Sequence, residues 1–248
     1  MKYFIFLALF AAKYAAPVQD DMIIGGYECR KNSVPYLAYV NYGFGFCAGA
    51  LISRTWVVAP ALCGWNTDMK VHLGEHNLGV SEGTEQIIDV EKMIDHPHVH
   101  WDYLYNNDIM LVKLSKPATL NNYVRTVSLP TSCAVAGTKC LISGWAEWSV
   151  PEGSYPDRLM CLDVPILSDT SCNSAFPGLI SSNMFCAESI KEGRKESCLY
   201  DIQTPLVCNG QLQGLMSWGE DCIWKNTPGV YTKVCKYNSW IREIMMSE

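Results

Sequence analysis

The chain has 248 residues, of which 49% are hydrophobic and 18% are charged, and this balance excludes a disordered, collagen-like or coiled-coil protein. Its length admits one large all-β domain or two smaller lobes. The formal net charge of −6 offers no basic surface to phosphate backbones, so we expect no nucleic-acid partner.

The N-terminal segment has the pattern of a secretory signal. Lys2 supplies a positive charge, residues 3–12 are apolar, and residues 15–16 are small enough to flank a cleavage site. The apolar run is well short of the about 20 residues that a membrane-spanning helix needs. We therefore expect a signal peptide at about 1–15, a propeptide-like segment at 16–22, a secreted, extracellular protein and no membrane span.

The rest of the chain consists of short runs of β-type residues separated by turn residues, a spacing typical of sandwiches and barrels. The predicted strands are 36–40, 48–52, 56–59, 70–73, 85–90, 108–114, 140–145, 162–166, 205–208, 211–218 and 229–234. One helix is predicted near the C-terminus, where Asn238 or Ser239 can cap it. Its apolar face comprises Trp240, Ile241, Ile244 and Met245.

Several short motifs follow one another along the chain. They are Ile23-Ile24-Gly25-Gly26-Tyr27-Glu28-Cys29, Asn107-Asp108-Ile109-Met110-Leu111, Ser143-Gly144-Trp145, Ser217-Trp218-Gly219 and Pro228-Gly229-Val230-Tyr231. In this order they resemble the motifs of the trypsin family of serine proteases. The resemblance implies an all-β fold of two six-stranded antiparallel barrels with a short C-terminal helix. It covers a trypsin-like domain at 23–248, with the two lobes meeting near 121–131.

The twelve cysteines are an even number that suits an oxidising compartment. The resemblance implies six disulfides that leave no free thiol. The pairs are Cys29 with Cys161, Cys47 with Cys63, Cys133 with Cys235, Cys140 with Cys208, Cys172 with Cys186, and Cys198 with Cys222.

The catalytic positions that the resemblance implies are altered. Serine proteases of this family use a serine nucleophile, a histidine base and a buried aspartate. Leu62 stands where the family has the histidine, Ile202 stands where it has the serine, and Asp108 matches the aspartate. A leucine cannot accept a proton and an isoleucine has no nucleophilic atom, so these remnant triad positions are predicted to be non-functional.

The neighbouring positions also indicate a loss of catalytic function. Tyr200 replaces a family glycine whose N–H enters the oxyanion hole, and a side chain there is expected to distort the site. Asp201 matches the family aspartate that receives the freed ammonium of the residue at Ile23. Met22 precedes Ile23, and trypsin-type cleavage requires a cationic residue at that place. We therefore expect a zymogen-like cleft.

The substrate-pocket positions that the resemblance implies are changed at the acidic base and otherwise resemble the family pocket. Glu196 stands at the acidic base of the pocket, one methylene longer than the family aspartate. The other pocket-like residues are Ser197, Ser217, Gly219 and Gly229. Such a pocket can still receive Lys or Arg, and the alternative is a carboxylate that is simply solvated. The edge at 217–219 is expected to retain the backbone that pairs with extended peptides.

The segment 75–85 resembles the calcium loop of trypsins. The implied ligands are the carboxylates of Glu75 and Glu85, the carbonyls of Asn77 and Val80, and Glu82 through a water molecule. Hard oxygen donors of this kind suit a structural Ca²⁺ ion. The alternative is a solvated acidic turn.

Loss of the serine or the histidine from a triad costs about 10⁶ in turnover. We therefore predict a secreted, catalytically inactive homologue, not an enzyme. It is expected to act as a monomeric binding or regulatory protein for an extracellular protein or peptide. One alternative is a serine endopeptidase that cleaves after Lys or Arg. Another is a decoy that binds basic peptides or protease inhibitors.

Overall fold

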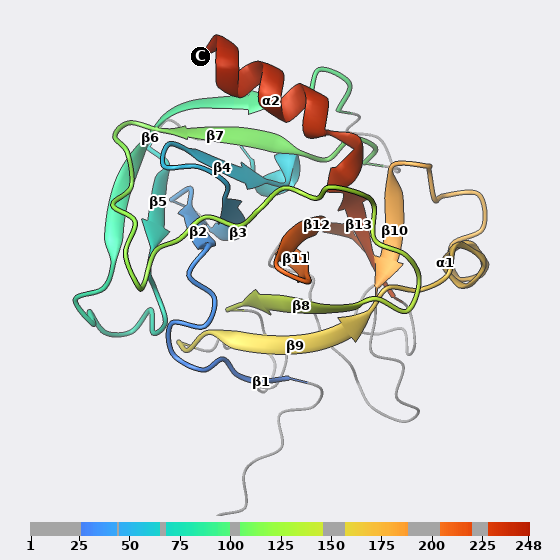
Figure 1. The fold of residues 1–248 in the computed structure, drawn as a ribbon, viewed down its shortest axis with the longest axis horizontal. Coiled ribbons are helices and arrows are strands. Elements are labelled where there is room, and N and C mark those ends of the chain that lie inside the picture. The colour runs from blue at the N-terminus through green and yellow to red at the C-terminus, as the bar shows by residue number, and fades with distance from the viewer. Residues whose placement is uncertain are drawn as a thin grey trace, which may run out of the picture.

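The computed structural model describes residues 26–43, 45–64, 68–99, 105–145, 157–187, 204–219 and 228–248. In these stretches the chain is mostly β, as predicted, with a closed barrel, a second antiparallel sheet and two short α-helices (Figure 1). The two sheets use successive halves of the chain, apart from one short N-terminal strand that joins the second sheet.

The closed barrel contains six antiparallel strands in the order β2-β3-β4-β7-β6-β5. Their bounds are β2 Leu37–Asn41, β3 Phe46–Leu51, β4 Trp56–Ala59, β5 Lys70–Leu73, β6 Gln86–Asp95 and β7 Met110–Leu114. The alternating pattern of β5 shows how the core forms, because Val71 and Leu73 are fully buried while Lys70 is exposed. The first predicted barrel is therefore confirmed.

The second sheet has the strand order β1-β9-β8-β11-β12-β13-β10. Its bounds are β1 Tyr27–Glu28, β8 Lys139–Gly144, β9 Met160–Pro165, β10 Met184–Ala187, β11 Pro205–Cys208, β12 Gln211–Trp218 and β13 Gly229–Lys233. Within the described residues it has seven strands, where the resemblance implied six and the strand pattern gave five. The sequence pattern missed β1, which is two residues long, and β10, whose four residues are all buried and do not alternate.

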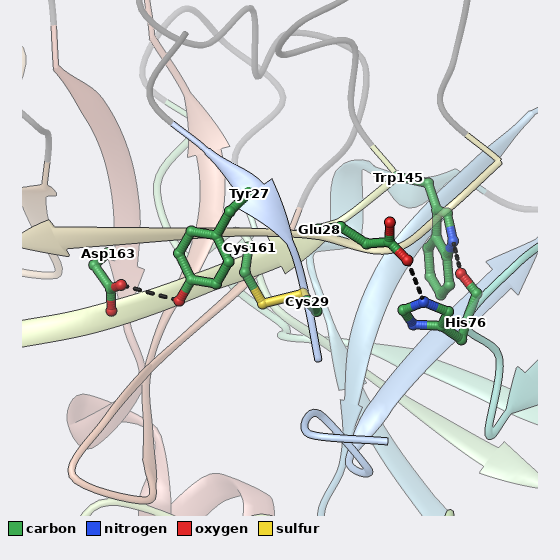
Figure 2. Close-up of a disulfide and its surroundings, with 7 residues drawn as sticks. All are labelled: Tyr27, Glu28, Cys29, His76, Trp145, Cys161 and Asp163. Carbon is green, nitrogen blue, oxygen red and sulfur yellow. Dashed lines mark hydrogen bonds and ion pairs between the residues drawn. A yellow bond between two sulfur atoms is a disulfide. The ribbon is translucent and has the colours of Figure 1, made fainter. Parts of the chain in front are cut away.

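Strand β1 is only two residues long, and its tertiary contacts hold it in place. Cys29 forms a disulfide with Cys161 of β9, and Tyr27 donates its hydroxyl hydrogen bond to Asp163, 3.0 Å away. Figure 2 shows these contacts together with the contact between Glu28 and His76. The start of the described chain is thus fastened to both the second sheet and the loop that carries His76.

The helices include one that the sequence analysis missed. Helix α1, Asp169–Ala175, begins after Ser168, whose side chain accepts a hydrogen bond from the Ser171 N–H. Two single 3₁₀ turns, η1 Ala61–Cys63 and η2 Val234–Lys236, flank the strands. A short helix without a long apolar stripe leaves little periodicity to read.

The predicted C-terminal helix is present as α2, Asn238–Ser247. Ile241 of its apolar face is buried in a core cluster, and Trp240, Ile244 and Met245 pack against that cluster as expected. The prediction that Asn238 or Ser239 caps it is wrong. The N-cap is Tyr237, which makes no side-chain cap hydrogen bond, and the side-chain amide of Asn238 donates to the carbonyl of Pro130. At the other end of α2, Lys92 of β6 lies 2.5 Å from a Glu248 carboxylate oxygen. Neither helix of the described chain has the length and apolar character to cross a bilayer.

Five disulfides stabilise the described residues, and they are five of the six pairs that the resemblance implied. Their sequence separations range from 14 residues for Cys172 with Cys186 to 132 for Cys29 with Cys161. Closing such loops contributes on the order of 2–4 kcal/mol each. The predicted pair of Cys198 and Cys222 lies outside the described residues.

Candidate active site

Asp108 lies between the two sheets, just before β7, and its side chain is completely buried. One carboxylate oxygen, Oδ1, accepts a hydrogen bond from the Leu62 N–H at 2.9 Å. The other, Oδ2, accepts one from the Ser217 hydroxyl at 2.5 Å. The backbone carbonyl of Asp108 accepts a further hydrogen bond from Thr232 Oγ1 at 2.8 Å. Groups from the barrel and from β12 and β13 of the second sheet therefore converge on this residue.

Burial raises the pKa of the Asp108 carboxyl to about 6, and the hydrogen bonds from Ser217 and from the backbone N–H groups of Leu62 and Ala61 oppose that rise. The phenol of Tyr237 is buried nearby, and its pKa is also raised, first by burial and then by the negative charge of Asp108. Burial therefore destabilises the ionised form of Asp108, and the surrounding hydrogen-bond donors partly offset this cost.

Leu62 is placed beside Asp108 by the 3₁₀ turn η1, which the disulfide between Cys47 and Cys63 ties to β3. The residue contributes its main-chain N–H to the carboxylate. Its side chain is half-buried and carries no titratable group. Within the described residues, the position next to the buried aspartate thus supplies a hydrogen-bond donor and no proton acceptor.

Several predicted site residues lie outside the described residues: Glu196, Ser197, Tyr200, Asp201 and Ile202, together with Met22 and Ile23. The predictions of a distorted oxyanion hole and of a zymogen-like cleft rest on these residues and stay predictions. The triad positions that the structure does describe, Leu62 and Asp108, lie in contact.

The three described pocket-like residues lie at the end of β12 and the start of β13. The fold brings the strand ends together, because Trp218 pairs with Val230, and a Cβ added to Gly219 would lie 3.5 Å from the Cα of Gly229. Ser217 is buried and is committed to Asp108. The sequence analysis assigned Ser217 to the pocket and missed this contact, for which no local pattern gives a signal.

The predicted calcium ligands face two different cavities. Glu75, Val80 and Glu85 line a cavity of about 270 Å³, whereas Asn77 and Glu82 line another of about 480 Å³. The loop is entered at Gly74, whose φ of +76° and close approach to the Thr84 carbonyl require glycine. Among the described residues, no three His, Cys, Asp or Glu side chains are grouped around one metal position.

The carboxylates of this loop have other partners in the structure. Glu75 lies 3.1 Å from His72 Nδ1, and Glu82 lies 2.7 Å from Lys31 Nζ. Glu85 accepts a hydrogen bond from the Glu82 N–H. Burial acts to raise the pKa of Glu85, but backbone N–H donors, led by that of Glu82, outweigh it and lower the pKa. Glu85 therefore remains ionised at neutral pH and is available to a cation.

Comparison with known proteins places the chain in a family. The trypsin family model matches residues 23–241, which include both sheets. The chain belongs to the trypsin family. It is 58% identical to Trypsin-3 of Salmo salar, over 96% of this chain and all of that protein. It is 53% identical to Cationic trypsin-3 of Rattus norvegicus, over 98% of each chain, and 54% identical to Trypsin of Sus scrofa, over 90% of this chain and 96% of that one.

These relatives contradict the prediction of a catalytically inactive binding protein. Trypsin-family proteins of 53–58% identity that align with nearly the whole chain are named trypsins, and they favour the alternative of a serine endopeptidase. The prediction inferred the activity of the whole molecule from the replaced residues at positions 62 and 202, supported by those at positions 22 and 200. Of these four, the structure describes position 62.

Proposed function

We propose that this trypsin-family chain is a secreted serine endopeptidase that cleaves peptides after Lys or Arg. The observation that carries the proposal is the similarity to proteins named trypsin over nearly the whole length of the chain. Five disulfides and the apolar N-terminal segment of the sequence support secretion, because such bonds persist in oxidising compartments.

The described residues give this site a buried carboxylate and a peptide-binding edge. Asp108 is oriented by Leu62 and Ser217, so its oxygens point in fixed directions. The end of β12 can pair with an extended peptide by adding a strand. Glu196 supplies the negative charge for a Lys or Arg side chain. Leu62 has no proton acceptor in its side chain, and its role in the proposed site is to orient Asp108 through its main-chain N–H.

The proposal is tested by turnover of fluorogenic peptides that differ only in Arg, Lys or Ala before the scissile bond. We expect kcat/KM for the Arg and Lys peptides to exceed that for the Ala peptide by at least about 10-fold, since one charge-assisted contact contributes about 1.5–3 kcal/mol and tenfold corresponds to 1.4 kcal/mol. The Asp108→Asn variant, purified in parallel, should lose this turnover. Rates equal to a protein-free blank, or rates unchanged in Asp108→Asn and so due to a contaminant, would refute the proposal.

We also propose that the segment 75–85 binds a structural Ca²⁺ ion. The support is chemical, because Glu75, Val80 and Glu85 line the same cavity, two of them carry carboxylates, and Ca²⁺ takes six to eight oxygen ligands. Bound there, the ion would neutralise carboxylates that otherwise repel one another. Glu75 and Glu85 would bind it through carboxylate oxygens and Val80 through its carbonyl.

A further inference from the structure

The hairpin that joins β11 to β12 turns on two residues, Asn209 and Gly210. Cys208 pairs with Gln211 across this turn, and its two residues have positive φ angles of +51° and +75°. A type I′ hairpin turn requires positive φ at both central residues, which favours Asn followed by Gly. The 248-residue sequence contains this Asn-Gly pair once, and both of its residues are exposed.

An Asn-Gly pair holds an electrophile and a nucleophile next to each other. The electrophile is the side-chain amide carbon of asparagine, Cγ, and the nucleophile is the backbone nitrogen of the next residue. Their bond closes a five-membered ring. The nitrogen attacks after it has lost its proton to hydroxide, so an exposed N–H without a hydrogen-bond acceptor reacts most readily. Glycine assists because it has no Cβ to hinder the approach.

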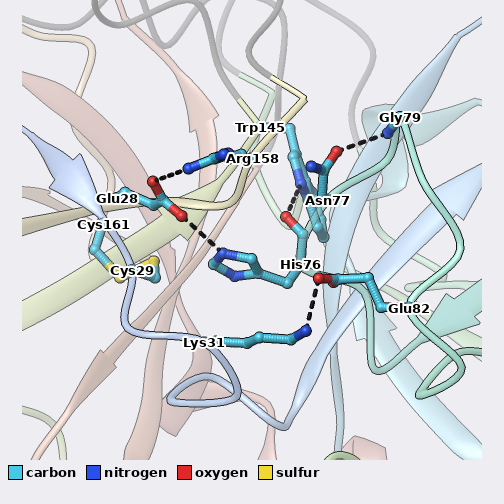
Figure 3. Close-up of polar contacts among 10 residues, drawn as sticks. All are labelled: Glu28, Cys29, Lys31, His76, Asn77, Gly79, Glu82, Trp145, Arg158 and Cys161. Carbon is cyan, nitrogen blue, oxygen red and sulfur yellow. Dashed lines mark hydrogen bonds and ion pairs between the residues drawn. A yellow bond between two sulfur atoms is a disulfide. The ribbon is translucent and has the colours of Figure 1, made fainter.

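The electrophile of this pair is free to move. The side-chain amide of Asn209 makes no hydrogen bond with another described residue. Other asparagines of the described chain are held by such bonds. Asn77, for example, accepts a hydrogen bond from the Gly79 N–H at 2.9 Å (Figure 3). The amide of Asn209 can therefore rotate towards the main chain, whereas that of Asn77 is restrained.

The nucleophile is also unoccupied. The Gly210 N–H donates to no group of the described protein, and a Cβ built on Gly210 would meet no atom within 4 Å. Asn32 gives a comparison within the same chain. It has a positive φ of +62°, and its amide likewise makes no hydrogen bond with a described residue. However, the next nitrogen, that of Ser33, donates to the Arg30 carbonyl at 2.9 Å and is not available for attack.

We propose that Asn209 is a site of spontaneous deamidation in the folded protein, through a succinimide formed with Gly210. The Gly210 nitrogen gives its proton to hydroxide and bonds to Asn209 Cγ, and the side-chain nitrogen leaves as ammonia. Water then opens the ring at one of its two carbonyls, which yields an aspartate or an isoaspartate. Overall one water is consumed and one ammonia is released, and no oxidant or reductant takes part.

The two products affect the hairpin differently. Both add one negative charge, because a solvated carboxyl is ionised at neutral pH. The isoaspartate also lengthens the main chain of the turn by one carbon. The ends of the turn are fixed, since Cys208 is bonded to Cys140 of β8 and the Gln211 amide exchanges two hydrogen bonds of 3.3 Å with Thr131. The isoaspartate therefore disturbs the pairing of Cys208 with Gln211, and the aspartate leaves it intact.

The test is incubation of the folded full chain at neutral pH and physiological temperature. Samples taken over time are analysed by isoelectric focusing and by peptide mapping with mass spectrometry. We expect the first new species to be shifted by one negative charge, with the conversion at Asn209 and ahead of any conversion at Asn32. Its rate of formation should rise in proportion to the hydroxide concentration, because the Gly210 nitrogen must be deprotonated.

Two variants assign the charge shift to this turn. Asn209→Gly removes the amide and keeps the turn, since glycine adopts positive φ readily, and it should lose the first acidic species. Asn32→Gly is the matched control and should form that species as the parent chain does. Peptide mapping of the parent chain needs neither variant to fold. The proposal is overturned if Asn209 stays intact in the folded chain while the denatured chain converts there, if Asn32 converts as fast as Asn209, or if the first acidic species persists in Asn209→Gly.

Discussion

The Ser217 hydroxyl donates a hydrogen bond to Asp108 Oδ2 across 2.5 Å, although 109 residues separate the two in the sequence. Both residues are buried, and the contact joins the end of β12 to the segment that enters β7. The second sheet thus supplies a donor that keeps the carboxylate of the barrel oriented and partly compensates for its burial.

Replacing Ser217 with Ala should lower the free energy of unfolding by about 1–3 kcal/mol, because one oxygen of a buried carboxylate loses its donor. Since Ser217 holds the pKa of Asp108 down, the variant should also raise that pKa above the value in the parent chain. Denaturant unfolding at pH 7 measures the stability. Ser174→Ala, at an exposed position of α1, is the control and should change stability by less than about 0.5 kcal/mol. Equal effects of the two substitutions would contradict the role given to Ser217.

The ionisation of Asp108 should make stability fall as the pH rises. Its pKa is about 6 in the folded chain against 3.8 for an unperturbed Asp, so the folded state binds more protons between these values. Stability due to this group is therefore greatest below about pH 4 and is lost as the pH passes 6, by on the order of 3 kcal/mol.

The variant Asp108→Asn isolates this contribution, because Asn does not titrate. The unfolding free energy of the parent chain, minus that of Asp108→Asn, should therefore decrease from pH 4 to pH 7. Other carboxyls titrate alike in both proteins and cancel. A difference that stays constant over this range would show that Asp108 has an ordinary pKa.

Restoring both altered triad positions should increase turnover. We expect Leu62→His combined with Ile202→Ser to raise kcat/KM on a Lys or Arg peptide by at least about 10³-fold, because the imidazole would lie beside Asp108 and the residues of a triad act as a unit. Each single substitution should change the rate by less than about tenfold for the same reason.

The control for this rebuilt site is the further change Asp108→Asn. In serine proteases of this family, loss of the aspartate is known to lower kcat about 10⁴-fold, since the histidine then has the wrong tautomer. A double variant whose rate does not respond to Asp108→Asn would show that the introduced histidine does not contact Asp108.

Calcium should raise the melting temperature if segment 75–85 binds it. At a Ca²⁺ concentration about 100 times the dissociation constant, the stabilisation is about 2.7 kcal/mol, or about 5–10 °C for a chain of this size. Scanning calorimetry with Ca²⁺ against a chelator measures the shift. Glu75→Gln should abolish most of it, whereas Glu243→Gln, at an exposed position of α2, should not. A shift that survives Glu75→Gln would place the ion elsewhere.

Much of the strand content could be predicted from the sequence, because alternation and turn residues are local signals. The predicted strands at 56–59 and 70–73 coincide with β4 and β5. Strand β6 was predicted to end at residue 90 but continues to Asp95, since its pairing with β7 resumes after an irregularity between Val90 and Lys92. That continuation depends on the partner strand and has no local signature.

The sequence by itself determined the β-rich class, the family and the identity of the residues at the altered positions 62 and 202. Only the tertiary structure decided what those residues touch. It joins Ser217 to Asp108, and it closes a cavity around His76 with residues from the N-terminal strand and from position 158. The physical reason is that strand patterns repeat over two residues, whereas the donors and acceptors of a site are brought together by chain segments tens to more than a hundred residues apart.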